Sequence, residues 1–189
     1  YHRKIEKCSK CGGVGKTITR KQPQATQELP YDFIKADPMP PYCLEWLKQR
    51  GISEDDISKY GLFYAWHTLV DNIMYPSRLI IPVLRKDKTF SFFQARALFN
   101  ENPKYVSAKN IRKEYFVCCE HNESNTIYVV EDALSAIRLA KYVNVVALLG
   151  NSLTDTLMGT TLMKYDHLKI WLDDDAGGRT GIYKILSTY

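Results

Sequence analysis

Three carboxylates in the C-terminal third of the chain have the types and spacing that could bind a divalent cation. Glu131 follows the apolar run IYVV, and Asp173 and Asp175 follow the run LKIWL. In an extended chain alternate side chains share a side, so Asp173 and Asp175 should point one way and Asp174 the other. Clustered carboxylates repel unless a cation neutralises them, and Mg²⁺ prefers oxygen ligands. The pattern predicts a metal site suited to phosphate transfer.

Helix capping is the simpler alternative for the same acids. Acidic residues are common in the first turn of a helix because they offset its dipole, and 173–175 lie just before a predicted helix. A single acid there would imply no chemistry. Glu131 together with an Asp-x-Asp, each after an apolar strand, favours the metal site.

Alternating strands and helices would bring these acids together. Strands are expected at about 127–130, 143–149 and 168–172, with helices at about 132–142, 154–163 and from 177. Repeats of this length predict a parallel sheet with right-handed crossovers, whose ligands gather beyond the carboxyl ends of the strands. Gly150 and Asn151 lie at that edge, where they could contact a phosphate or simply form a turn before a helix cap. The glycine-rich segment 176–181 lacks the Lys-Ser/Thr ending of a P-loop.

A basic, aromatic segment precedes this region. Residues 79–84 and 89–95 are β-rich runs around the charged turn RKDK, which predicts a hairpin. Arg96 and the segment NPKY (102–105) follow, with more cations up to Lys113. Cations interleaved with Tyr and Phe are typical of a nucleic-acid groove, because cations bind phosphates and rings stack on bases.

Charge is unevenly distributed along the chain. The 26 Lys and Arg against 21 Asp and Glu leave a net charge of +5. Residues 1–21 hold seven cations and one acid, and residues 78–113 hold nine cations and two acids. These blocks favour a polyanionic partner, although a solvated surface with uneven charge would look the same. No apolar run is long enough to cross a bilayer.

The N-terminal part contains half of a zinc site. Cys8 and Cys11 have the two-residue spacer that lets both thiolates reach one ion, but a structural zinc needs four ligands. The other ligands lie upstream of Tyr1, or His2 contributes, or there is no zinc; a redox pair is a further alternative. The chain begins without Met, so we treat it as a fragment. Five cysteines without a secretory signal favour a reducing compartment.

Two short helices are expected between the N-terminal part and the hairpin. Residues 21–40 contain several prolines without helical or strand periodicity, which predicts a linker. Pro41 suits the start of a helix that Gly51 ends. Ser53 and Asp56 form a capping-box pattern that opens a second helix to about Tyr60.

These motifs together resemble a known family. The segments IYVVEDALSAIRLA, VVALLGNSLT and KIWLDDDAGGRTG are similar, in order and spacing, to the three signature segments of the TOPRIM domain. The preceding stretch resembles bacterial-type DNA primase, particularly its phage relatives. RLIIPVLRKDKTFSFFQARAL with NPKYVSAKN resembles the basic half of that catalytic core, and CLEWLKQRGISEDDISKYGLFYA resembles its helical entry. The resemblance covers most of the chain from residue 42 onward.

The resemblance implies a fold and an activity. The expected fold is α/β, with a TOPRIM-type parallel sheet flanked by helices, preceded by a mixed α+β basic subdomain and a partial zinc-ribbon arm. The implied units are 1–20 (zinc-ribbon-like), 21–40 (linker), 41–120 (helical and basic subdomain) and 121–189 (TOPRIM domain). The implied activity is synthesis of short RNA primers on single-stranded DNA with Mg²⁺ or Mn²⁺. The resemblance also implies Zn²⁺ as a second metal, ribonucleoside triphosphates as substrates and a replicative helicase as a partner. The implied location is the cytoplasm of a bacterial or phage-infected cell.

The resemblance also assigns residues. Glu131, Asp173 and Asp175 match the metal-binding acids, with Asp174 as a further candidate ligand. The positions that match basic-subdomain residues handling nucleotide phosphates or template are Arg96, Lys104 and Tyr105, with Arg78 and Lys113 as weaker candidates.

Two positions depart from the typical primase pattern: Asp132 stands for Gly, and Ser135 stands for Asp. The number of bound metals therefore stays open, and Asp132 or Asp174 could compensate. Another TOPRIM enzyme, of the nuclease or topoisomerase kind, and a decayed primase that only binds single strands are the alternatives.

Overall fold

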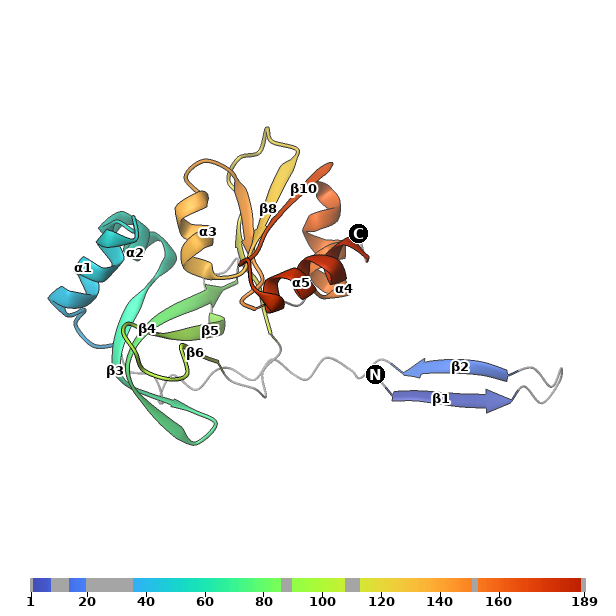
Figure 1. Cartoon of the computed structure of the whole chain (residues 1–189), viewed down its shortest axis with the longest axis horizontal. Helices are drawn as coiled ribbons and strands as arrows, with labels where there is room; N and C mark the ends of the chain where they lie inside the picture. Colours follow the sequence, from blue (N-terminus) through green and yellow to red (C-terminus); the bar gives the residue numbers. More distant parts are fainter. Residues whose placement is uncertain are drawn as a thin grey trace.

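Two four-stranded sheets dominate the described part of the chain (Figure 1). One sheet has the order β3-β4-β5-β6 and is antiparallel throughout. The other has the order β10-β8-β9-β7 and combines three parallel strands with one antiparallel edge strand. The structure is a computed structural model that describes residues 2–7, 14–19, 36–85, 90–107, 113–150 and 153–187.

Two short helices lead into the antiparallel sheet, as predicted. Helix α1 (Pro41–Gln49) begins with a proline, whose missing N–H would have had no helical partner at that position. Helix α2 (Glu54–Tyr60) begins with a capping box in which the Ser53 N–H donates to the Asp56 carboxylate at 2.8 Å and the Asp56 N–H donates to the Ser53 hydroxyl. Gly61 ends α2 with a left-handed backbone (φ 63°).

The antiparallel sheet contains the predicted hairpin and an additional strand. Its strands are β3 (Phe63–Val70), β4 (Ile73–Leu84), β5 (Phe90–Ala97) and β6 (Tyr105–Val106). The pairing of β4 with β5 confirms the predicted hairpin, but the hairpin of β3 and β4 was not predicted. Its turn is Asp71-Asn72, with φ of 49° and 64°, as two-residue hairpin turns require.

The mixed sheet confirms the predicted α/β class and its parallel strands. Its strands are β7 (Phe116–Cys118), β8 (Thr126–Val130), β9 (Asn144–Ala147) and β10 (His167–Trp171). The helices are α3 (Ala133–Leu139), α4 (Asp155–Thr160), the 3-10 helix η2 (Leu162–Lys164) and α5 (Ala176–Leu186). The antiparallel strand β7 was not predicted, because three residues are too few to show alternation.

A shared core fixes the two sheets to one another. One cluster of buried apolar side chains includes Trp46 of α1, Leu79 of β4 and Ile137 of α3. A second cluster lies on the other face of the mixed sheet and includes Leu157 of α4 and Ile185 of α5. Helix α3 therefore covers one face of this sheet, and α4 and α5 cover the other (Figure 1).

The N-terminal part forms an antiparallel pair of strands, β1 (His2–Lys7) and β2 (Val14–Thr19). Cys8 and Cys11 fall between these strands and lie outside the described residues, as does most of the predicted linker. The zinc half-site therefore stays a prediction. Among the residues that the structure describes, no helix has the length and apolar character needed to cross a membrane.

Candidate functional site

An acidic edge forms where β8 and β10 end. These strands are parallel neighbours, with Trp171 paired to Val130, so the residues that follow them leave the sheet at one edge. The pKa of Glu131 is raised by burial and, in addition, by the negative charges of Asp173 and Asp175, while a backbone hydrogen bond from Asp173 partly offsets these effects. The structure thus brings together the three carboxylates that the sequence singles out.

The start of α5 holds Asp175 and Asp173 in place. Asp175 is the N-cap of α5, and its carboxylate accepts a hydrogen bond from the Gly178 N–H at 2.7 Å. A Cβ atom on Gly178 would lie 1.9 Å from the Asp173 carbonyl oxygen, so only glycine fits there. Asp174 lies elsewhere: its side chain is 94% exposed and forms an ion pair with Arg179 at 2.6 Å.

Asp132 caps α3, and Ser135 supports it. The Asp132 carboxylate accepts hydrogen bonds from the Leu134 and Ser135 N–H groups, and from the Ser135 hydroxyl at 2.6 Å. The two residues that depart from the family pattern therefore form one capping unit. Within the described residues, no group of three or more His, Cys, Asp or Glu side chains is arranged as a metal site. The mutual repulsion around Glu131 is nevertheless what a bound cation would relieve.

A basic, aromatic pair faces the acidic edge. Arg96 of β5 and Tyr105 of β6 are cross-strand partners, and the Arg96 guanidinium donates a hydrogen bond to the Tyr105 hydroxyl. The pKa of Tyr105 is raised by burial first and then by the negative charge of Asp132, with a smaller contribution from Glu131. Tyr105 therefore lies close to the start of α3, and the antiparallel sheet meets the mixed sheet at this point.

Two lysines flank this meeting point. The Lys104 ammonium lies 5.7 Å from the centre of the Tyr105 ring. The Lys113 ammonium lies 3.2 Å from where a Cβ of Gly150 would be, and the Gly150 N–H donates to the Glu131 carbonyl at 3.3 Å. Burial lowers the pKa of Lys113. Lys113 and Gly150 therefore lie at the same edge as Glu131, whereas Asn151 lies outside the described residues.

The sequence reasoning missed Trp46 of α1 and Arg50, the C-cap of that helix, as neighbours of Arg96. The Arg50 guanidinium lies 3.6 Å from the centre of the Trp46 ring, and the Arg96 guanidinium lies 5.0 Å from the same centre. Burial lowers the pKa of Arg50, and the positive charge of Arg96 lowers it further. The spacing of four between Trp and Arg on a helix could have suggested the pair, but only the tertiary structure brings it to Arg96.

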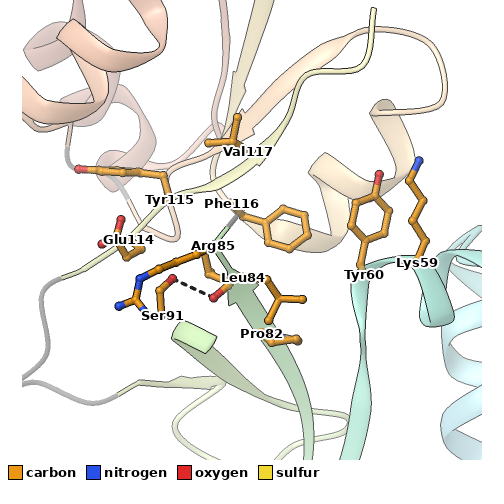
Figure 2. A pocket seen from close by; sticks show the side chains of 11 residues that line it. Lys59, Tyr60, Pro82, Leu84, Arg85, Ser91, Glu114, Tyr115, Phe116 and Val117 are labelled. Carbon is orange, nitrogen blue, oxygen red and sulfur yellow. Dashed lines mark hydrogen bonds between the residues drawn. The ribbon is translucent and has the colours of Figure 1, made fainter. Parts of the chain in front are cut away.

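A separate cavity of about 280 Å³ lies between α2, the β4–β5 hairpin and residues 114–117 (Figure 2). Aromatic and aliphatic side chains such as Tyr60, Leu84 and Phe116 line it. Neither the acidic edge nor Arg96 contributes to its lining. Lys59 and Arg85 are the cations of its lining, and Lys59 forms an ion pair with Glu120 at 2.7 Å. The cavity is therefore distinct from the candidate site.

The mixed sheet and its helices have the α/β fold of a TOPRIM domain, and solved structures with the same fold can be named. The fold is that of the catalytic core of bacterial DNA primase. A DnaG primase catalytic domain bound to single-stranded DNA matches with 20% identity and a TM-score of 0.64, over 80% of this chain and 60% of that one. The Aquifex aeolicus primase, with its zinc-binding and RNA polymerase domains, matches with 20% identity and a TM-score of 0.63, over 78% and 46%. A primase domain from Pseudomonas aeruginosa matches with 18% identity and a TM-score of 0.65, over 78% and 59%.

The chain spans less than two thirds of the length of each of these three structures. Comparison with protein-family models and with curated proteins finds no match. At these identities the likeness to solved structures establishes the fold, while the activity has to be argued from the site.

Proposed function

We propose that this chain is part of a DNA primase that joins ribonucleotides on a single-stranded DNA template. The observation on which this depends is the position of Glu131, which lies near Asp173 and Asp175 and also near Tyr105, the hydrogen-bond partner of Arg96. A cluster of carboxylates beside a cluster of cations suits a substrate with many phosphates, because a divalent ion can bridge the acids to phosphate oxygens. The fold of primase catalytic cores supports the same conclusion.

Glu131, Asp173 and Asp175 would hold Mg²⁺ or Mn²⁺, which would supply neutralisation of the phosphate charge when bound. Arg96, Lys104 and Lys113 would contact the phosphates of nucleotide or template, and Arg50 would add a further cation. In this assignment Asp174 is not a metal ligand, because it forms an ion pair with Arg179. Asp132 is not a metal ligand either, because it caps α3. Burial, and then repulsion from Asp173 and Asp175, raise the pKa of Glu131, so a bound cation would stabilise the three ligands in their charged forms.

The partners proposed for the longer protein follow from the same assignment. One of the similar structures is described as bound to single-stranded DNA, which fits the cations Arg96 and Lys104 beside Tyr105. Another contains a zinc-binding domain, which fits the proposal that Cys8 and Cys11 are half of a zinc site. The same proposal includes ribonucleoside triphosphates as substrates and a replicative helicase as a partner. It also includes a location in the cytoplasm of a bacterial or phage-infected cell.

Primer synthesis by the longest available chain on single-stranded DNA, with ribonucleotides and Mg²⁺, tests the proposal. The Asp173→Asn variant should lose about 100-fold or more in rate, because one charge that stabilises the reacting phosphates is removed. The matched control is Asp174→Asn, which removes a neighbouring charge that is exposed and paired with Arg179. Equal product from the wild type and Asp173→Asn would overturn the metal assignment.

A decayed primase that only binds single strands is the second candidate, and Ser135 is the observation in its favour. Ser135 supplies a hydroxyl to the Asp132 cap where the family pattern has a carboxylate, so one metal ligand is missing. This candidate predicts DNA binding that is unchanged when Mg²⁺ is removed, and no ribonucleotide incorporation. DNA cleavage without added nucleotides would instead indicate a nuclease of the TOPRIM group.

A further inference from the structure

Arg78 is a fully buried cation in the middle of β4. Its relative exposure is 1%, and it is among the largest completely buried side chains of the described residues. One guanidinium nitrogen donates a hydrogen bond to the Pro103 carbonyl at 2.8 Å, while Nε has no hydrogen-bond partner among the described residues. The Tyr75 ring centre lies 5.5 Å away. Burial lowers the pKa of Arg78, and the negative charge of Glu101, on the same loop as Pro103, only partly offsets this. Burying this guanidinium is therefore costly, and its position calls for a specific reason.

The bond to Pro103 fixes the loop that precedes Lys104. This loop connects β5 to β6, and its ends are joined by the hydrogen bond from the Ala97 N–H to the Lys104 carbonyl at 2.9 Å. Arg78 attaches the loop to a third strand, β4, through the residue directly before Lys104. Lys104 itself is exposed, and its ammonium lies beside the Tyr105 ring. The buried Arg78 thus holds Pro103, the residue directly before the exposed Lys104.

We propose that Arg78 is a positioning residue for Lys104, acting through its hydrogen bond to the Pro103 carbonyl rather than by touching DNA or nucleotide. A guanidinium with 1% exposure is out of reach of a phosphate, whereas the side chain that it helps to aim is in solvent. This inference rests on the proposed function, because it assumes that Lys104 contacts a phosphate.

Binding of a fluorescein-labelled single-stranded oligodeoxynucleotide, measured over a range of KCl concentrations, tests the inference. The proteins are the full chain, Lys104→Ala, Arg78→Met and the double variant. Lys104→Ala should weaken binding about tenfold and reduce the slope of log K against log[salt] by about 1, as loss of one phosphate contact does. Arg78→Met should weaken binding by a similar factor and reduce the slope in the same way. The double variant should bind within about twofold of Lys104→Ala, because the two changes remove one interaction.

Additive losses in the double variant would overturn the inference and would instead make Arg78 an independent contributor to binding. An unchanged salt slope in Arg78→Met would overturn it as well. If Lys104→Ala binds normally, both the inference and the phosphate role of Lys104 fall, while Mg²⁺-dependent primer synthesis would still support the proposed function. The two failures are therefore distinguishable.

Two further variants separate positioning from folding. Arg78→Lys keeps a donor that can reach a carbonyl, so it should bind more tightly than Arg78→Met and recover part of the salt slope. If Arg78→Met does not fold, Arg78→Lys replaces it in the double-variant comparison.

Ile81→Ala leaves a cavity in the same strand, at a fully buried position away from the loop. It should lower the melting temperature and leave the salt slope unchanged. A changed slope in Ile81→Ala would show that the effect comes from general loss of packing and would overturn the inference.

Discussion

The two sheets assemble their charged residues in different ways. In the antiparallel sheet, Arg96 and Tyr105 are nine residues apart and meet as cross-strand partners across one short loop. In the mixed sheet, Glu131 and Asp173 come from distant parts of the sequence and meet because β8 and β10 are parallel neighbours. The basic side, formed by Arg96 and Tyr105, therefore depends on a local connection. The acidic side, formed by Glu131, Asp173 and Asp175, depends on the topology of the whole domain and on where two helices begin.

The two sides also differ in how they affect stability. Arg96 is supported by the rings of Tyr105 and Trp46, so its charge is accommodated by attractive contacts. Glu131 instead has a raised pKa, caused by burial and by the charges of Asp173 and Asp175. Like charges repel on both sides, but the repulsion between Arg50 and Arg96 is offset by their contacts with the Trp46 ring, whereas the repulsion around Glu131 is what a bound cation would relieve. The following predictions test this difference, from the largest expected effect to the smallest.

Gly178→Ala should abolish most of the activity by disturbing the acidic side. The added Cβ would lie 1.9 Å from the Asp173 carbonyl oxygen, so the backbone that carries Asp173 must move. Misplacement of a catalytic group by about 1 Å can cost about 100-fold in rate, and we expect a loss of that size in primer synthesis. The matched control is Gly159→Ala on α4, where no atom lies within 4 Å of the added Cβ. Activity should survive there, since alanine is the better helix former. Equal rates for the two variants would contradict the claim that the start of α5 positions Asp173.

Glu131→Gln should stabilise the metal-free protein while removing activity. Because burial, and then repulsion from Asp173 and Asp175, raise the pKa of Glu131, the folded protein loses stability as the pH rises through that pKa. The glutamine variant should gain about 0.5–1 kcal/mol in EDTA at neutral pH, and the gain should disappear in acid. Thermal melting in EDTA and in Mg²⁺ measures this. Mg²⁺ should stabilise the wild type more than the variant. Asp174→Asn is the control and should show no gain, because Asp174 is exposed and paired with Arg179.

Local signals in the sequence were enough to predict the elements that carry the site. Capping chemistry at Ser53 and Asp56 marked the start of α2, and apolar runs ended by acids marked β8 and β10. Because parallel strands end at one edge of a sheet, these two strand ends were enough to predict that Glu131 and Asp173 lie together. The predicted hairpin of β4 and β5 followed from the same kind of pattern.

The missed features depend on tertiary contacts or on very short segments. Strand β7 is three residues long, and the alternation of β3 is interrupted by its mixture of buried and exposed apolar residues. The burial of Arg78 in β4 and the approach of Arg96 in β5 to the Trp46 ring of α1 depend on how the antiparallel sheet packs. Nothing in the local sequence distinguishes a buried arginine from an exposed one, so its anchoring role could be inferred only from the tertiary contacts.

Asp56→Ala should give the smallest effect on activity, because it changes the contact between the two halves of the molecule and not the candidate site. Asp56 caps α2 and forms an ion pair with Lys141, which follows α3, at 2.7 Å. Burial raises the pKa of Asp56, but hydrogen bonds from Lys141 and Ser53 outweigh it and lower the pKa overall. Removing the carboxylate should cost about 1–2 kcal/mol at neutral pH, most of it from the lost cap.

The pH dependence and a matched ion pair make the Asp56 prediction specific. Because the folded pKa is lowered, the stabilisation by Asp56 is present above the ordinary carboxyl pKa and is lost as the pH falls through the folded value. The wild type and Asp56→Ala should therefore converge in acid, as measured by urea unfolding. The control is Lys59→Met, which removes an ion pair with Glu120 between the same two halves, with side chains 48% and 54% exposed. Exposed pairs contribute little, so its stability should change by less than about 0.5 kcal/mol. If Lys59→Met costs as much as Asp56→Ala, the exposed ion pair contributes as much as the buried cap, and the prediction is wrong.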